Sequence, residues 1–63
     1  MIERRYSAVE TGDQLCMSCG IETVIAVREA EQFYADRHIT VTALGTDQLS
    51  TWDTDARRDV MTL

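Results

Sequence analysis

Apolar and polar residues alternate with a period of two over residues 2–10. Tyr6 and Val9 within this segment are good strand formers. An alternation of this kind is typical of a strand with one buried face. The pattern therefore predicts a strand over residues 2–10.

A short helix is predicted next. Thr11 and Gln14 have the three-residue spacing of a capping box, in which two side chains satisfy the first backbone N–H groups of a helix. Three apolar positions then fall on one helical face, and Gly20 provides a helix end. These positions are Leu15, Cys16 and Cys19.

The segment that begins at residue 22 supports two interpretations. Residues 22–27 have the β-branched density of a buried strand, whereas residues 28–37 have a helical pattern. Four residues form that helical face: Ala26, Ala30, Phe33 and Tyr34. The alternatives are a strand 22–27 followed by a helix 28–37, or one helix from about 21 to 37. The second would point Val24, Ile25 and Val27 in three directions, so we favour strand then helix.

Residues 39–44 give the clearest strand, because apolar residues alternate there with threonines. After Gly45, five apolar residues recur at helical spacing: Leu49, Trp52, Ala56, Val60 and Leu63. Ser50 and Asp53 have capping-box spacing, and Asp53 with Arg57 forms a favourable (i, i+4) pair. The pattern predicts a C-terminal helix over about 50–61.

Together these elements predict an α+β fold for a single domain, 1–63. It would be a small two-layer α/β unit in which two to three strands pack on two helices. If strands 22–27 and 39–44 are parallel neighbours, helix 28–37 is their right-handed crossover. A domain of this size buries only about 60% of the surface that its unfolded chain exposes. A core this small favours a binding module over an enzyme, and we expect no catalytic residues.

The charge distribution narrows the class of partner. Six arginines and no lysine face eleven Asp and Glu residues, for a net charge of −5 spread evenly along the chain. There is no basic stripe to follow phosphates, so direct binding of DNA or RNA is disfavoured. A partner with a basic surface is favoured, because opposite fields steer encounter. The predicted partner-binding residues are Glu22, Glu29, Glu31, Asp36, Trp52, Asp53, Asp55 and Asp59.

The predicted helices group some of these carboxylates. Glu22, Glu29 and Asp36 are seven residues apart and would form one line on a continuous helix. Asp55 and Asp59 would lie one turn apart, with Cβ atoms about 6 Å from each other, similar to phosphate spacing along a strand. The alternative is an ordinary solvated face. Trp52 has polar neighbours and is the aromatic best suited to an interface, although a core position is the alternative.

Cys16 and Cys19 form the only motif of note, and three interpretations are open. The cysteines are apolar core residues, half of a zinc site, or a redox pair. His38 is the only other soft ligand and leaves a zinc site in one chain a ligand short. Two cysteines in the core is the interpretation we favour, so no metal and no cofactor are predicted. His38 itself is expected at the end of a helix.

No apolar stretch approaches the roughly 20 residues that span a bilayer, and no apolar signal region follows Met1. The sequence therefore predicts a cytoplasmic protein that does not contact membranes.

In length, acidity and lack of catalytic motifs across the whole chain, the protein resembles small phage-encoded anti-CRISPR proteins. That resemblance implies an inhibitor in the host cytoplasm that blocks a basic nucleic-acid-binding surface on a larger protein or nucleoprotein complex, with DNA mimicry as one mode. Two alternatives come from other classes. One is a metal-binding or thiol regulator built on Cys16 and Cys19, in which a homodimer completes a four-thiolate site. The other is an antitoxin-like partner that oligomerises.

Overall fold

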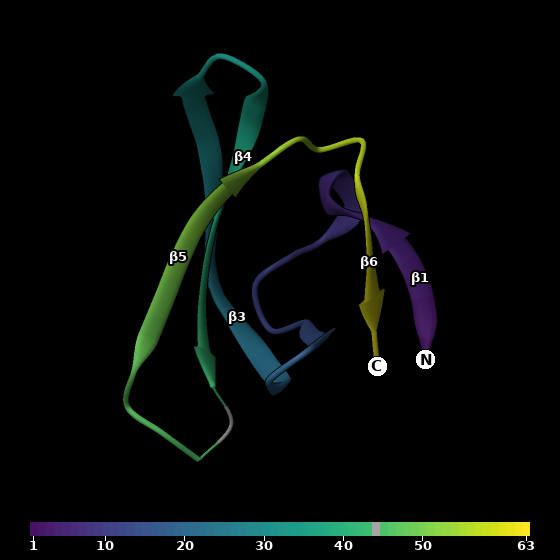
Figure 1. The fold of residues 1–63 in the computed structure, drawn as a ribbon, viewed down its shortest axis with the longest axis vertical. Helices are drawn as coiled ribbons and strands as arrows, with labels where there is room; N and C mark the ends of the chain where they lie inside the picture. Colours follow the sequence, from purple (N-terminus) through teal and green to yellow (C-terminus); the bar gives the residue numbers. More distant parts are fainter. Residues whose placement is uncertain (44) are drawn as a thin grey trace.

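The computed structural model describes residues 1–43 and 45–63 and contains one antiparallel sheet of six strands (Figure 1). The spatial order of the strands is β1-β6-β2-β3-β4-β5. A single turn of 3-10 helix, η1 (Tyr6–Ala8), follows the first strand. The strands are β1 (Ile2–Arg5), β2 (Gln14–Met17), β3 (Gly20–Gln32), β4 (Ala35–Ala43), β5 (Leu49–Thr54) and β6 (Asp59–Thr62).

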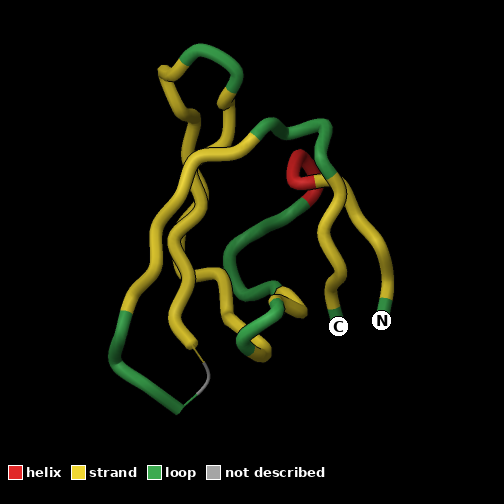
Figure 2. The backbone as a smooth tube through the Cα atoms, in the orientation of Figure 1, coloured by secondary structure: helices red, strands yellow, loops and turns green. Residues whose placement is uncertain are grey.

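The sheet curves so that β3, β4 and β5 lie on one side of the core and the terminal strands β1 and β6 on the other (Figures 1 and 2). The segment after η1 runs between them (Figure 2). Backbone hydrogen bonds anchor that segment, because Gly12 N–H donates to the Val24 carbonyl over 2.8 Å. The enclosed side chains are Tyr6, Val9, Leu15, Val24, Ile39, Val41 and Val60. Small β-branched residues dominate this core, as expected for strands.

The predicted α+β fold, with helices on a sheet, is wrong, because the described residues form an all-antiparallel sheet without an α-helix. A β-bulge in β3 explains part of the error. Val24 pairs with Val41 and Val27 pairs with Ile39, so one extra residue separates the two pairs. Because of the extra residue, two side chains that are three residues apart in the sequence lie on the same face of the strand. The same spacing in the sequence is typical of a helix.

Both interpretations of residues 21–37 included a helix, and that helix is wrong in each. The strand over 22–27 is confirmed within β3. The proposed crossover between parallel strands is replaced by a tight hairpin, in which Gln32 pairs with Ala35 across the two-residue loop Phe33–Tyr34. Antiparallel neighbours need no crossover. The helical face assigned to Ala30, Phe33 and Tyr34 is the end of this hairpin.

The predicted helix 50–61 is likewise wrong, since it covers most of β5, a turn and the first three residues of β6. Trp52 lies opposite Ile39 of β4 and packs partly against the core. Leu49, by contrast, is 60% exposed, so the apolar residues of this segment do not share a face. The turn before β6 is closed by Asp55, whose Oδ1 accepts from the Arg57 backbone N–H over 2.8 Å.

At the N-terminus the predicted strand 2–10 is correct only over Ile2–Arg5, after which η1 turns the chain inward. The predicted helix after Thr11 is wrong, because that segment is β2 and the start of β3, with Ser18 and Cys19 between paired Met17 and Gly20. Strand 39–44 is confirmed over 39–43 within β4, and Leu44 lies outside the described residues. In the described part of the chain, no helix has the length and apolar character needed to cross a membrane.

Candidate functional site

The outer ends of β3 and β4 project from the sheet as a hairpin (Figure 1, top). Residues 28–38 form this hairpin arm, which ends in the two-residue loop of Phe33 and Tyr34. A second register shift, between Glu29 and Gln32, places an extra residue in β3 near the end of the arm. Bulges of this kind bend the strand and increase its twist, which aims the arm away from the core.

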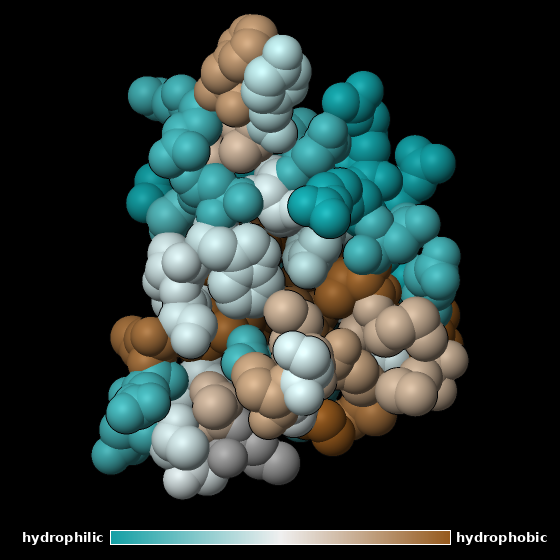
Figure 3. All heavy atoms as spheres, viewed as in Figure 1, coloured by the Kyte–Doolittle hydropathy of each residue, from teal (hydrophilic) through white to brown (hydrophobic). Residues whose placement is uncertain are grey.

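The tip of the arm is aromatic and exposed. Phe33 is 85% and Tyr34 84% accessible, and their ring centroids are 4.1 Å apart. Figure 3 shows a hydrophobic group beside a near-neutral one at the end of the hairpin, with hydrophilic residues below them in the upper part of the molecule. Tyr34 also has a φ of 72°, a conformation that glycine or asparagine usually provides in tight turns.

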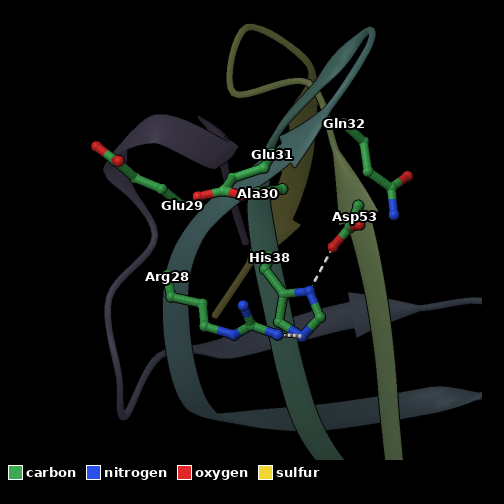
Figure 4. A pocket seen from close by; sticks show the side chains of 7 residues that line it. All are labelled: Arg28, Glu29, Ala30, Glu31, Gln32, His38 and Asp53. Carbon is green, nitrogen blue, oxygen red and sulfur yellow. Dashed lines mark hydrogen bonds and ion pairs between the residues drawn. The ribbon is translucent and has the colours of Figure 1, made fainter.

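At the root of the arm, Arg28, His38 and Asp53 form a row across β3, β4 and β5 (Figure 4). Arg28 Nη2 donates to His38 Nε2 over 3.2 Å, and His38 Nδ1 donates to Asp53 Oδ1. A guanidinium only donates, so Nε2 must accept and the ring proton lies on Nδ1. The row therefore uses both ring nitrogens of His38 to join three strands.

An open hollow of about 390 Å³ lies beside this row and is lined by residues 28–32, His38 and Asp53 (Figure 4). No serine or cysteine is among these lining residues, and the Nε2 lone pair is occupied by Arg28. The hollow therefore contains no hydroxyl or thiol nucleophile and its histidine is not a free base, and the unpaired carboxylates of Glu29 and Glu31 are the bases that remain. Its acidic and amide groups are instead suited to receive a cationic side chain.

Three exposed carboxylates, Glu29, Glu31 and Asp36, surround the arm below its tip, and we call them the acidic collar. Asp36 Oδ1 accepts from the Ala56 N–H over 2.5 Å, which fixes its position. Within the described residues, neither Glu29 nor Glu31 forms an ion pair. Their charges therefore face solvent without a counterion from the chain.

The arginines near the collar already have partners. Arg28 donates to His38, as described above. Arg37 Nη2 donates to the Val9 carbonyl over 2.8 Å, and Arg57 forms a two-bond pair with Asp55. Arg28 and Arg37 keep their full charge, because their hydrogen-bond acceptors are neutral, so three carboxylates against two arginines leave the arm with a net charge of −1.

Asp55 lies near the tip, and its pairing with Arg57 leaves the two residues without net charge. A second hollow of about 170 Å³ is lined by Asp55 and Asp36 together with Tyr34 and three neighbours. Hydrogen bonds from the Arg57 side chain and backbone lower the pKa of Asp55 to about 2. This carboxylate is therefore ionised at any physiological pH.

The other predicted site residues lie elsewhere. Glu22 is only 7% exposed, and Asp59 lies on β6 opposite Arg5 of β1. Trp52 is half-buried and faces the core. Asp53 belongs to the row at the root of the arm. Thus the fold gathers Glu29, Glu31, Asp36, Asp53 and Asp55 around the arm, and it leaves Glu22, Trp52 and Asp59 outside. The predicted carboxylate lines on helices do not exist.

Neither cysteine belongs to the core, since Cys16 lies half-buried in β2 opposite Ile21 and Cys19 lies in the β2–β3 turn. Cys19 is exposed and its thiol donates to Glu22 Oε1 over 3.1 Å. This hydrogen bond and the charge of Glu22 raise the pKa of Cys19, which lowers its thiolate fraction and its reactivity. Among the described residues, no group of three or more His, Cys, Asp or Glu side chains could hold a metal.

Sequence reasoning missed Phe33, Tyr34 and Arg28 as site residues. The aromatic pair was assigned to a helix face, because the sequence around it contains no Asn-Gly or similar signal of a two-residue turn. Arg28 and His38 are ten residues apart, and only strand register brings them together.

No protein-family model, curated protein or solved structure matches this chain.

Proposed function

We propose that this protein is a binding module that inhibits a larger partner by docking its hairpin arm on a basic, nucleic-acid-binding surface. The observation that carries this proposal is the acidic collar, whose Glu29 and Glu31 have no counterion among the described residues. An excess of negative charge on a projecting element raises the rate of encounter with an oppositely charged surface.

The site supports binding better than catalysis. The hollow beside the arm has no hydroxyl or thiol nucleophile, and its histidine is hydrogen-bonded through both ring nitrogens. The core is small for the support of a buried active site. The resemblance to small anti-CRISPR-type inhibitors also implies a partner that handles nucleic acid. A cluster of carboxylates competes with phosphates for the same arginines and lysines of such a partner.

Affinity capture followed by titration tests the proposal. The chain is immobilised through its C-terminus, which lies away from the arm (Figure 1), and proteins retained from the native cells are purified. Each is titrated calorimetrically at low, physiological and high salt, with and without duplex DNA or RNA. We expect an affinity that falls with rising salt, because exposed charges are screened, and competition by nucleic acid.

Charge reversal locates the binding surface. Glu29→Arg with Glu31→Arg should weaken binding by about tenfold or more, whereas thermal stability should change little, since exposed carboxylates contribute little to stability. The matched control is Glu3→Arg with Asp59→Arg on the terminal strands, which changes net charge equally and should bind normally. Salt-independent binding, or a complex that nucleic acid joins without competition, contradicts the proposal.

A further inference from the structure

We propose that Phe33 and Tyr34 are the anchor of the complex, and that they insert into an apolar pocket of the partner whose rim is basic. This inference rests on the proposed function and adds the chemistry of the partner's binding site. The acidic collar alone would compete with nucleic acid for a basic surface of the partner. The aromatic tip requires that the partner also has a cavity.

The exposure of the tip is the first argument. Two of the four aromatic residues of the chain lie at one loop, and each is more than four-fifths accessible. A domain with a core of seven side chains has few large apolar groups, yet it leaves this pair outside. Adjacent exposed aromatic side chains are typical of interface anchors, because they bury a large area at a small cost in side-chain entropy.

The backbone at Tyr34 is the second argument. A positive φ is unfavourable for a bulky side chain, and asparagine or glycine would adopt it with less strain. The tyrosine ring gains little from the fold in return, since it contacts only its neighbour Phe33 among aromatic side chains and remains exposed. A strained residue that contributes little to folding points to a role in binding.

Charge complementarity identifies the occupant. Glu29 and Glu31 follow the arm toward the tip, and Asp36 lines a hollow beside Tyr34 in which Asp55 is already paired with Arg57. A pocket that accepts the tip must place its rim against these carboxylates, so a basic rim is required. An anionic lipid surface would be repelled by the same groups. A second copy would bring its own collar against the first if the two tips met.

A small synthetic host reproduces this chemistry and serves as the probe. A cationic amino-β-cyclodextrin has an apolar cavity with a ring of ammonium groups, and unmodified β-cyclodextrin has the same cavity without charge. Each host is titrated into the folded protein and followed by NMR. We expect contacts between the host interior and the rings of Phe33 and Tyr34, and binding of the cationic host about tenfold tighter than of the neutral host at low salt.

Variants separate the anchor from the charge. Phe33→Ala, and independently Tyr34→Asn, should weaken binding of both hosts by several-fold, about tenfold when combined. Glu29→Arg with Glu31→Arg should remove only the preference for the cationic host. Leu49→Ala removes another exposed apolar side chain, on β5, and should change neither affinity. Thermal melts of each variant establish that the fold is intact.

Any one of the following results would overturn the inference. The hosts could contact Leu49 or the terminal strands and not the tip, or the two hosts could bind equally well. Alternatively, the protein alone could self-associate in sedimentation, or bind phosphatidylcholine vesicles, through Phe33 and Tyr34. If the tip variants are silent but charge reversal still removes the preference, the anchor fails while the proposed function stands. If the tip variants weaken binding but charge reversal leaves the preference unchanged, the anchor stands and the basic rim is refuted.

Discussion

Tyr34 shows how one residue can be poorly suited to the fold and well suited to a surface. Its φ of 72° lies in a region that costs a non-glycine residue about 1 kcal/mol. Asparagine tolerates this region, because its short polar side chain can hydrogen-bond locally. The exposed tyrosine ring contributes little burial to offset the cost.

Tyr34→Asn should therefore raise the free energy of unfolding by about 0.5 kcal/mol, and the melting temperature by roughly 2–4 °C. Chemical and thermal denaturation measure this change. Phe33→Asn is the control, because Phe33 does not have a positive φ and the same substitution there relieves no strain. A Tyr34→Asn variant that is clearly less stable than the wild type would show that the ring supports the turn.

At the scale of elements, the Arg28–His38–Asp53 row connects the arm to the sheet. His38 Nδ1 donates to the Asp53 carboxylate, and such charge-assisted bonds are about twice as strong as neutral ones. The side chains of His38 and Asp53 are 19% and 16% exposed, so solvent competes only in part for this hydrogen bond. The arm should therefore loosen when Asp53 loses its charge.

Asp53→Asn is expected to lower stability by about 1 kcal/mol, and to speed amide exchange in the arm by roughly fivefold to tenfold. Hydrogen exchange read by NMR gives the rate at each amide. Asp59→Asn serves as the control, since Asp59 is exposed on β6 and forms no ion pair among the described residues. Faster exchange confined to β1 and β6, with the arm unchanged, would show that the Arg28–His38–Asp53 row does not hold the arm to the sheet.

The elements also show where sequence patterns were informative. Strand 39–43 was predictable, because an alternation of threonines and apolar residues indicates a strand with one buried and one more exposed face. In β3, by contrast, the bulge between Val24 and Ala26 changes the alternation, and residues beyond it have a helical spacing. A bulge depends on the partner strand, so a single strand's sequence does not specify it.

The candidate site was predictable in its charge and not in its geometry. Glu29, Glu31 and Asp36 were expected to bind a partner, and they do lie together on one arm. The aromatic tip and the row below it depend on register between β3, β4 and β5, which brings distant positions together. Burial of Glu22 beside Cys19 likewise follows from the β2–β3 hairpin.

In the whole molecule, the residues of the core and those of the candidate binding surface belong to different parts of the fold. The core lies between two parts of one curved sheet, and the arm projects beyond it with an aromatic end and an acidic surround (Figures 1 and 3). Because few core side chains belong to the arm, changes to its surface should alter binding more than stability.

Site-specific photocrosslinking in the native cells tests this account most directly. A benzophenone amino acid replaces Phe33 at the tip, and in separate proteins it replaces Ile2 of β1 or Ser18 at the β2–β3 turn. We predict one discrete covalent adduct with a nucleic-acid-binding protein from position 33, lost when Glu29→Arg and Glu31→Arg are added, and none from the other two positions. Adducts from position 2 or 18 with none from position 33 would contradict the account.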